Sequence, residues 1–367
     1  MRKKIISVLL FIAMIATLLA ACGKKDTETG SQGGTATDTG SKAKTVGVCM
    51  PSKTLQRWNQ DGDNMKKQLE AVGYKVDLQY ADDDIPTQVS QIENMIANGV
   101  DVLVIASIDG DSLGTVLAQA KEKNIPVIAY DRLIMNTDAV NYYATFDNYL
   151  VGAKQGEYIE EALDLKNASG PFNLEIFTGD PGDNNAKFFY NGAMDVLRPY
   201  IDSGKLVVKS GQIEFAEVAT AGWKTENAQS RMENIISSFY ADGTTLHAVL
   251  CSNDSTALGV ANALTSSYTG EWPIITGQDC DIANVKNMLA GKQAMSVFKD
   301  TRTLANQVVK MVEAIMKGEK APVNDEKSYN NGKGIVPSYL CEPVVVTIDN
   351  YKEKLIDSGY YTEDQLK

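Results

Sequence analysis

Five apolar segments of the chain end in side chains that can donate and accept hydrogen bonds. The clearest of them, residues 125–132 (IPVIAYDR), is an apolar run that ends in an acid beside a guanidinium. The polar groups at the five ends are Asp131-Arg132, Asp183-Asn184-Asn185, Asn253-Asp254, Gln278-Asp279 and Lys299-Asp300. An isolated Asp-Arg pair is usually a solvated loop ion pair. Five such ends favour instead a shared binding site at the carboxyl edge of parallel sheets.

The mixture of groups at these ends indicates the class of ligand that they suit. Carboxylates accept hydrogen bonds, amides both donate and accept them, and Arg and Lys donate them. The hydroxyl groups of a sugar need this mixture, because each donates one hydrogen bond and accepts others. A phosphate would need mainly donors, and the sequence contains neither a P-loop nor a GxGxxG motif. Trp58 and Trp223 offer apolar ring faces to a pyranose, whereas Trp272, beside Pro273, is expected to be a packing residue.

The composition argues against several other functions. The 35 basic and 47 acidic residues give a net charge of −12, which opposes nucleic acid and anionic lipid as partners. The single histidine, His247, is expected at a strand edge, so neither zinc chemistry nor His-based catalysis is expected. Four cysteines have no CxxC or metal-ligand spacing and are expected to be small buried thiols: Cys49, Cys251, Cys280 and Cys341.

Strands and helices alternate along the chain in two successive series. We expect strands at residues 45–50, 76–81, 101–107, 125–132 and 142–145, then at 172–179, 205–210, 247–253, 273–279, 294–299 and 344–348. Apolar residues at helical spacing predict helices at 58–72, 87–97, 186–200, 226–240, 255–266, 303–316 and 351–357. Such alternation specifies βαβ units around parallel sheets. Because 367 residues exceed one ordinary core, we predict an α/β protein of two similar lobes with a cleft between them.

The N-terminal residues 1–21 have the pattern of a secretory signal peptide. Basic residues 2–4 precede an apolar segment, 5–20, which is too short for a stable membrane span. The sequence Leu-Ala-Ala-Cys that ends at Cys22 resembles a bacterial lipobox, which implies a lipid on Cys22. A plain signal peptide with an incidental cysteine is the alternative. Residues 22–44, rich in Gly, Ser, Thr and Asp, are expected to form a flexible tether.

From Val46 onward the chain resembles a family, the sugar-binding proteins of bacterial ABC importers. The resemblance is to the xylose-binding and multiple-monosaccharide-binding group with the ribose-binding-type fold. The motifs that carry it occur in the family's order: RW at Arg57, SQIENMIANGVDVLVIASIDG from Ser90, IAYDR from Ile128, FDN at Phe146, DNNA at Asp183, SND at Ser252, GQD at Gly277, FKDTR at Phe298 and NNG at Asn330. They cover the whole domain that follows the tether.

The resemblance implies a type I periplasmic binding protein fold, in which two doubly wound parallel-sheet lobes are joined by a three-crossing hinge. The chain would cross between lobes after Phe146, near Phe298 and near Pro337. The N-terminal lobe would then comprise residues 45–147 and 299–337, and the C-terminal lobe residues 148–298 and 338–367.

The resemblance also assigns functional residues and partners. It gives sugar hydrogen bonds to Arg57, Asp131, Arg132, Asp183, Asn185, Asn253, Asp279 and Lys299, and stacking faces to Trp58 and Trp223. It implies an extracytoplasmic, lipid-anchored monomer without cofactor, metal or catalytic residue. This receptor would close on an aldose such as xylose, glucose, galactose or arabinose and deliver it to an ABC transporter permease.

Three alternatives remain open at this point. A glycosidase would use Asp131 and Asp279 as paired carboxylates, although the Arg, Lys or amide neighbour of each acid suits recognition better. A sugar sensor that presents its ligand to a chemoreceptor or receptor kinase would have the same fold and site. A transcriptional repressor core shares the two lobes, but the signal segment and the lack of a DNA-binding module argue against it.

Overall fold

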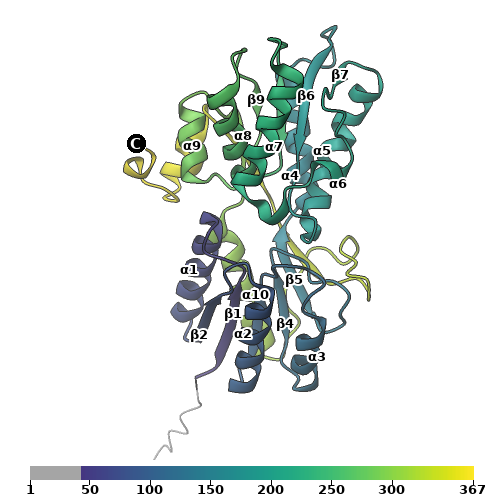
Figure 1. Cartoon of the computed structure of the whole chain (residues 1–367). Helices are drawn as coiled ribbons and strands as arrows, with labels where there is room; N and C mark the ends of the chain where they lie inside the picture. Colours follow the sequence, from purple (N-terminus) through teal and green to yellow (C-terminus); the bar gives the residue numbers. More distant parts are fainter. Residues whose placement is uncertain (1–42) are drawn as a thin grey trace, which may run out of the picture. The chain divides into compact units, whose positions relative to one another are not determined.

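Two sheets of mainly parallel strands, each covered by helices, form the core of the protein (Figure 1). The computed structural model describes residues 43–367. The expected signal peptide, Cys22 and the tether up to residue 42 lie outside the described residues. Within residues 43–367, no helix combines the length and the apolar character needed to cross a membrane.

The first sheet has the strand order β11-β5-β4-β3-β1-β2, and all neighbouring strands in it are parallel. Its strands are β1 (Thr45–Met50), β2 (Lys75–Tyr80), β3 (Val102–Ile105), β4 (Val127–Tyr130), β5 (Tyr142–Phe146) and β11 (Ser338–Cys341). Alternate residues face opposite sides: Val104 packs with α1 (Gln56–Ala71) and α10 (Thr301–Met316), and Leu103 with α2 (Ile85–Asn98) and α3 (Gly114–Glu122). Burial on both faces explains the continuous apolar runs of these strands.

The second sheet has the order β7-β6-β8-β9, again parallel, with β6 (Phe172–Phe177), β7 (Leu206–Val207), β8 (Ala248–Cys251) and β9 (Ile274–Ile275). One face packs on α4 (Asn148–Ala162) and α5 (Asn184–Asp202), and the other on α7 (Thr225–Ile235) and α8 (Asp254–Ser267). The second sheet continues beyond β9 into β10 (Met295–Phe298), because Ala294 N–H donates to the Ile275 carbonyl at 3.0 Å and Val297 N–H to the Gly277 carbonyl at 2.9 Å. Strand β10 pairs antiparallel with β12 (Val344–Thr347).

Shorter elements complete the chain around these sheets. They are α6 (Phe215–Val218), a 3₁₀ turn at Ala221–Trp223, a π-helical turn at Ile236–Tyr240, α9 (Ile282–Leu289), a second π-helical turn at Lys352–Asp357 and a final 3₁₀ turn at Glu363–Leu366. We call the elements on the first sheet the first lobe and those on the second sheet the second lobe. Figure 1 shows them as the lower and upper parts of the described unit.

The predicted α/β class with doubly wound parallel sheets is confirmed, with two departures in the strands. The antiparallel strand β12 breaks the all-parallel pattern of the second lobe. Strand β11 was not predicted, and its pairing of Ser338 with Tyr143 puts it in the first sheet. This pairing places residues 338–341 with the first sheet, whereas the resemblance assigns them to the C-terminal lobe. The third crossing near Pro337 stays a prediction. The chain leaves the first sheet only after Cys341. We propose the remaining lobe boundaries as stated above.

Several residues outside the site lie where the sequence predicts them. Trp272 packs against the core of α7 and α8, and its Nε1 donates to the Lys292 carbonyl at 2.9 Å. His247 directly precedes β8, and its Nδ1 accepts a hydrogen bond from Asn173 N–H at 2.9 Å. The four cysteines of the described region are free and buried, as expected.

Candidate functional site

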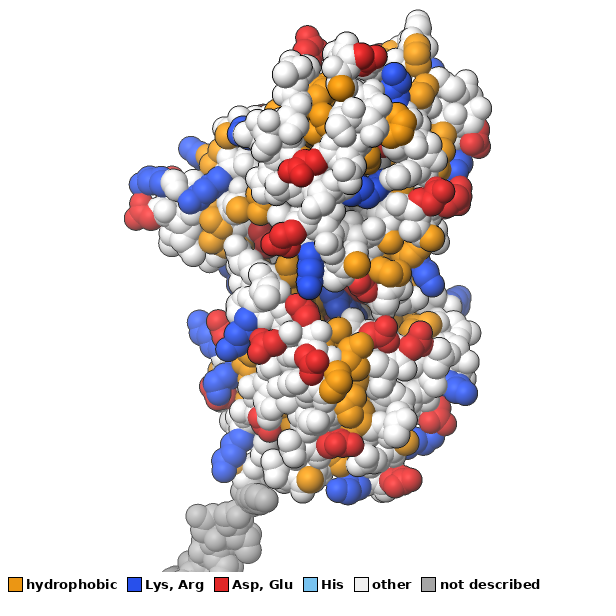
Figure 2. Space-filling model, viewed as in Figure 1, with side chains coloured by type: hydrophobic (Ala, Val, Ile, Leu, Met, Phe, Trp, Pro, Cys, Tyr) orange, Lys and Arg blue, Asp and Glu red, His pale blue; other side chains and the backbone are white. Residues whose placement is uncertain are grey.

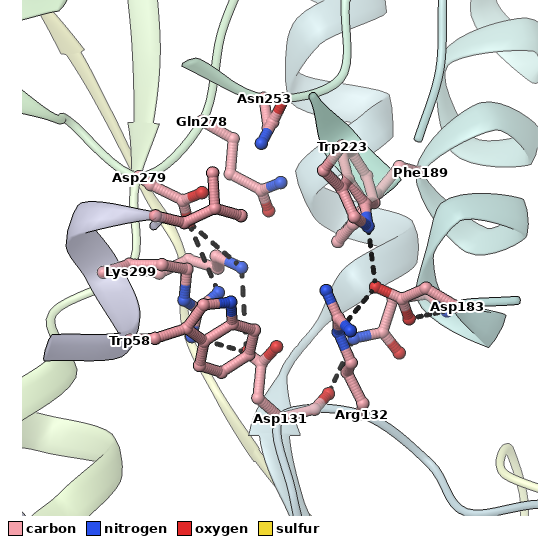
Figure 3. Close-up of a pocket in the computed structure, with 13 residues that line it drawn as sticks. Trp58, Asp131, Arg132, Asp183, Phe189, Trp223, Asn253, Gln278, Asp279 and Lys299 are labelled. Atoms are coloured by element: carbon pink, nitrogen blue, oxygen red, sulfur yellow. Dashed lines mark hydrogen bonds and ion pairs between the residues drawn. The ribbon is translucent and has the colours of Figure 1, made fainter. Parts of the chain in front are cut away.

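One pocket lies where the carboxyl ends of strands from both sheets meet, and it contains about 290 Å³ of free volume. The ten residues predicted from the sequence all line this pocket: Arg57, Trp58, Asp131, Arg132, Asp183, Asn185, Trp223, Asn253, Asp279 and Lys299. Figure 3 shows their side chains converging on one space from opposite sides.

Arg57 holds the carboxylates on the α1 side of the pocket. It lies in the first turn of α1, and its guanidinium contacts three acids: Asp61 at 2.9 Å, Asp131 at 2.9 Å and Asp279 at 3.4 Å. Asp61 is one helical turn further on and completely buried. Burial alone would lower the pKa of Arg57, but the neighbouring carboxylates outweigh burial and raise it well above its ordinary value. The charged guanidinium therefore compensates a buried acidic cluster.

Lys299 adds a second cation between the same acids. It follows β10, and its Nζ lies 3.2 Å from Asp279 Oδ1 and 3.7 Å from Asp131 Oδ1. Burial would raise the pKa of Asp131, but the surrounding cations, above all Arg57, outweigh burial and lower it. Asp131 is consequently a carboxylate at neutral pH, which can accept hydrogen bonds but cannot donate a proton.

Arg132 links the two lobes on the opposite side of the pocket. Its Nη1 donates to the Ser107 and Ile108 carbonyls at 3.0 and 3.2 Å, which fixes the guanidinium plane. Its Nε lies 3.0 Å from Asp183 Oδ2, at the start of α5 in the second lobe. No hydrogen bond within residues 43–367 involves its Nη2, so this group is available to a ligand.

Asp183 has two functions, because it caps α5 and lines the pocket. Its Oδ1 accepts from Asn185 N–H at 2.9 Å, and its Oδ2 accepts from Trp223 Nε1 at 3.2 Å. Burial raises the pKa of Asp183, and the charge of Arg132 only partly offsets this. Trp223 itself fits closely over Gly179: a Cβ at that position would lie 1.9 Å from the indole ring. Glycine is therefore required for this placement of the indole.

The two asparagines differ in how much hydrogen-bonding capacity they have left. Asn253 caps α8 through Oδ1, which accepts from Thr256 N–H at 3.0 Å, and its Nδ2 donates to Ser255 Oγ at 2.8 Å. One N–H of that amide is left for a ligand. Asn185 Nδ2 instead donates to the Asp131 carbonyl at 2.6 Å. We propose that Asn185 mainly positions Asp131.

Aromatic rings close the pocket on two sides. The Trp58 ring lies under two guanidinium groups, with Arg57 Cζ 4.4 Å and Arg132 Cζ 5.0 Å from the ring centroid. Trp223 meets Phe189 edge to face, with centroids 6.1 Å apart. Cation–π contacts of this kind fix both partners and leave a flat apolar surface beside charged donors.

The backbone at three pocket positions has an uncommon conformation. Asp131, Trp223 and Asp279 have φ angles of 57°, 57° and 98°, in the region that residues other than glycine rarely adopt. Such conformations cost free energy and persist where the surrounding structure enforces them, typically at functional sites. The packing of the pocket thus directs these three side chains inward.

Three lining residues lie outside the ten that the resemblance assigns: Leu55, Phe189 and Gln278, although Gln278 is among the polar groups expected at the strand ends. Phe189 lies four residues after Asn185, on the same face of α5, and this spacing was a usable signal. Gln278 is the most informative omission. Its Nε2 donates to the Ser252 carbonyl at 3.0 Å, whereas its buried Oε1 has no partner within residues 43–367. Because the Ser252 carbonyl requires a donor, the orientation of this amide is fixed.

The charges around the pocket are nearly balanced. Three cations, Arg57, Arg132 and Lys299, face the carboxylates of Asp131, Asp183 and Asp279. Figure 2 likewise shows acidic and basic side chains side by side at the narrow waist between the two lobes. A site whose charges compensate one another suits a neutral ligand with many hydrogen-bonding groups. A phosphate or carboxylate ligand would need a surplus of positive charge, which this pocket does not have.

Behind the pocket, the buried Asp254 and the half-buried Asp281 predict a pH dependence of stability. Asp254 is completely buried and accepts from Ser296 Oγ, Gln293 Nε2 and Asp281 N–H at 2.8–2.9 Å. Burial, followed by the charge of Asp279, raises the pKa of Asp281 to about 7. Burial and the Asp281 charge raise the pKa of Asp254 well above its ordinary value. Their stabilising contribution is complete below the unfolded-state pKa and is lost as the pH rises through the folded-state value.

We expect the free energy of unfolding of the unliganded protein to fall between about pH 5 and about pH 8. Asp281→Asn should flatten this slope and raise the melting temperature at the upper end, as measured by thermal melts across the range. Asp242→Asn is the control, because a hydrogen bond from Thr244 lowers the pKa of that exposed carboxyl, so it titrates below the window. If the free energy of unfolding of Asp281→Asn fell with pH as steeply as that of the parent, Asp281 would not be the group responsible.

Comparison with known proteins gives the same family as the sequence motifs. A family model described as a periplasmic binding protein domain matches residues 46–320. The multiple sugar-binding periplasmic protein SbpA of Azospirillum brasilense is 54% identical, over 88% of this chain and 91% of that protein. The D-xylose-binding periplasmic protein of Escherichia coli is 38% identical, over 88% of this chain and 92% of that protein.

Solved structures show the same likeness. An ABC transporter solute binding protein from Clostridium phytofermentans, with bound β-D-glucose, is 78% identical and has a TM-score of 0.88, covering 88% of this chain and 100% of that chain. A carbohydrate transporter solute binding protein from Chloroflexus aurantiacus, in complex with D-glucose, is 33% identical with a TM-score of 0.80, covering 89% of this chain and 98% of that chain. The resemblance inferred from the motifs is thus confirmed, and the chain belongs to the extracytoplasmic periplasmic binding protein family.

Proposed function

We propose that this protein captures one aldose monosaccharide between its two lobes and delivers it, unchanged, to an ABC transporter permease. The observation that carries the proposal is the pocket itself: balanced buried charges, donors and acceptors from both lobes, and the rings of Trp58 and Trp223. The relatives support the same ligand class, because two of them are named as a multiple sugar-binding and a D-xylose-binding protein. Two solved neighbours hold glucose. D-glucose and D-xylose are therefore the first candidates.

The arrangement of the carboxylates favours recognition over catalysis. Hydrolysis of a glycosidic bond needs one carboxylic acid that donates a proton and one carboxylate. Asp131 and Asp279 instead share the same cations, since both lie within 3.7 Å of Lys299 Nζ and within 3.4 Å of Arg57. The lowered pKa of Asp131 removes it as a proton donor. We propose that the protein is not an enzyme.

A thermal-shift screen against pentoses and hexoses, followed by analysis of the recovered sugar, tests this function. Ligand at about a hundred times its dissociation constant should add about 2.7 kcal/mol to the free energy of unfolding. The recovered sugar should be chemically unchanged. A hydrolysed, isomerised or oxidised product would contradict the proposal. Binding without uptake in transporter reconstitution would favour a sugar sensor instead.

We further propose that a lipid on Cys22 holds the protein at the outer face of the cell membrane. Cys22→Ser should move the protein from the membrane fraction to the soluble fraction and leave sugar affinity unchanged, because residue 22 precedes the described domain. Fractionation of cells that express either form, with titration of both, measures this. Continued membrane association of the Cys22→Ser protein would count against the lipid anchor.

Gln278 should contribute a hydrogen bond to one sugar hydroxyl group. Gln278→Met keeps the side-chain volume but removes the unpartnered Oε1, so the affinity should fall about tenfold or more. Titration with a series of deoxy sugars should reveal one analogue that binds parent and variant equally. Gln155→Met is a matched control, because Gln155 also donates to the Ser252 carbonyl and has an unpartnered Oε1, yet does not line the pocket. Equal losses in both variants would disprove the contact.

A further inference from the structure

Outside the pocket, the first turn of α1 is fastened to the second lobe by the side chain of Gln56. Its Nε2 donates to the hydroxyl group of Tyr361 at 2.6 Å, and its Oε1 accepts from Ile282 N–H at 3.2 Å. Both ends of one amide are thus bonded across the lobes. Gln56 and Tyr361 are 305 positions apart in the sequence.

The Tyr361 hydroxyl group has its full set of partners in this arrangement. It donates to the Cys280 carbonyl at 2.9 Å and also accepts from Gln60 Nε2 at 3.2 Å. Tyr361 is 3% exposed and packs in the second lobe with Val285, Leu355 and other apolar residues. The C-terminal segment therefore presents a fixed hydroxyl group to α1. A second contact, from the Tyr360 hydroxyl group to Gln60 Oε1 at 3.1 Å, lies beside it.

The bonds of Gln56 lie next to the ion pair between Arg57 and Asp279, which also joins the two lobes. Gln56 directly precedes Arg57, and Cys280 directly follows Asp279, so the two contacts between lobes lie side by side. Neither Gln56 nor Tyr361 lines the pocket. Separation of the lobes would break the hydrogen bonds that join Gln56 and Gln60 to the second lobe, and a bond made only in the closed state biases the equilibrium toward closure.

We propose that Gln56 and Tyr361 form a closure latch that slows sugar release without contacting the sugar. The latch rests on the proposed function, because it acts on the lobe closure that would retain the ligand. Gln56 and Tyr361 would act on the position of the lobes and not on the sugar itself. The C-terminal segment then contributes to affinity, although it lies outside the pocket.

Stopped-flow tryptophan fluorescence with D-glucose and D-xylose tests the latch in the full mature protein. Tyr361→Phe and Gln56→Met should each raise the sugar dissociation rate constant about 3- to 30-fold and leave the association rate constant within about twofold. The increase in the double variant should be smaller than the product of the two single increases, because the two changes share the bond between Gln56 and Tyr361. Melting temperatures of the unliganded proteins check that each variant is folded.

Tyr190→Phe is the matched control. Its hydroxyl group donates to the Ile213 carbonyl at 2.8 Å, entirely within the second lobe, so its loss should leave the dissociation rate unchanged. Parent-like dissociation from Tyr361→Phe, or an equal increase in Tyr190→Phe, would overturn the latch while the proposed function stands. A parent protein that binds neither these two sugars nor any other aldose would overturn both.

Discussion

Arg57→Met is expected to remove most of the sugar affinity and to lower the free energy of unfolding by about 3–5 kcal/mol. The reason is that Arg57 is the common partner of Asp61, Asp131 and Asp279, all of them buried. Without the guanidinium, Asp131 and Asp279 retain only Lys299 as an ion-pair partner, and Asp61 keeps only its hydrogen bond from Tyr130. Denaturant unfolding and calorimetric titration measure the two effects.

Two further variants show whether the loss arises from the buried network. Arg57→Lys keeps the charge but cannot make the same set of directed contacts, so it should restore stability more than affinity. Arg198→Met removes the exposed pair with Glu214, where Arg198 Nη1 and Glu214 Oε1 lie 3.2 Å apart, and should cost about 1 kcal/mol or less. If Arg57→Met were as mild as Arg198→Met, Arg57 would not be the centre of the site.

Asp131→Asn should weaken sugar binding by about 2–5 kcal/mol with little effect on folding. Asparagine keeps the size of the side chain and tolerates the φ of 57° at this position. It removes the charge that compensates Arg57 and Lys299 and that accepts hydrogen bonds from the ligand. Both cations retain Asp279 as a partner, which limits the loss of stability.

The exposed pair of Asp138 and Lys121 provides the comparison for this variant. Their Oδ2 and Nζ lie 2.7 Å apart, and both side chains are more than half exposed. Asp138→Asn should change neither the dissociation constant nor the melting temperature appreciably. Titration of both variants with the same sugar separates a buried recognition charge from a surface one. Parent-like affinity in Asp131→Asn would mean that this carboxylate does not meet the ligand.

The sequence predicts which residues come together because one geometric rule connects distant residues. Carboxyl ends of parallel strands meet at one edge, so Asp131, Asp183, Asp279 and Lys299 converge although they are far apart in the chain. Two of the site residues, Asp183 and Asn253, are also helix N-caps, which made the strand-to-helix turns recognisable.

What the sequence did not predict depends on tertiary contacts. Strand β11 is a short edge strand, Ser-Tyr-Leu-Cys, without a long apolar run, and only its pairing with β5 defines it. Asp61 reads as a polar helix residue, yet the fold buries it against Arg57 and Tyr130. The latch between Gln56 and Tyr361 joins opposite ends of the chain, so no local pattern could indicate it.

The central claim is that both lobes bind one monosaccharide, and isothermal titration with D-glucose and D-xylose tests it most directly. The parent should bind at least one aldose with one site per chain. Arg132→Ala, in the first lobe, and Asp279→Ala, in the second, should each weaken that binding at least tenfold, because each leaves sugar hydroxyl groups without a hydrogen-bond partner in the closed site. Their unliganded melting temperatures should stay close to that of the parent. Parent-like binding by either variant would contradict a site shared between the lobes.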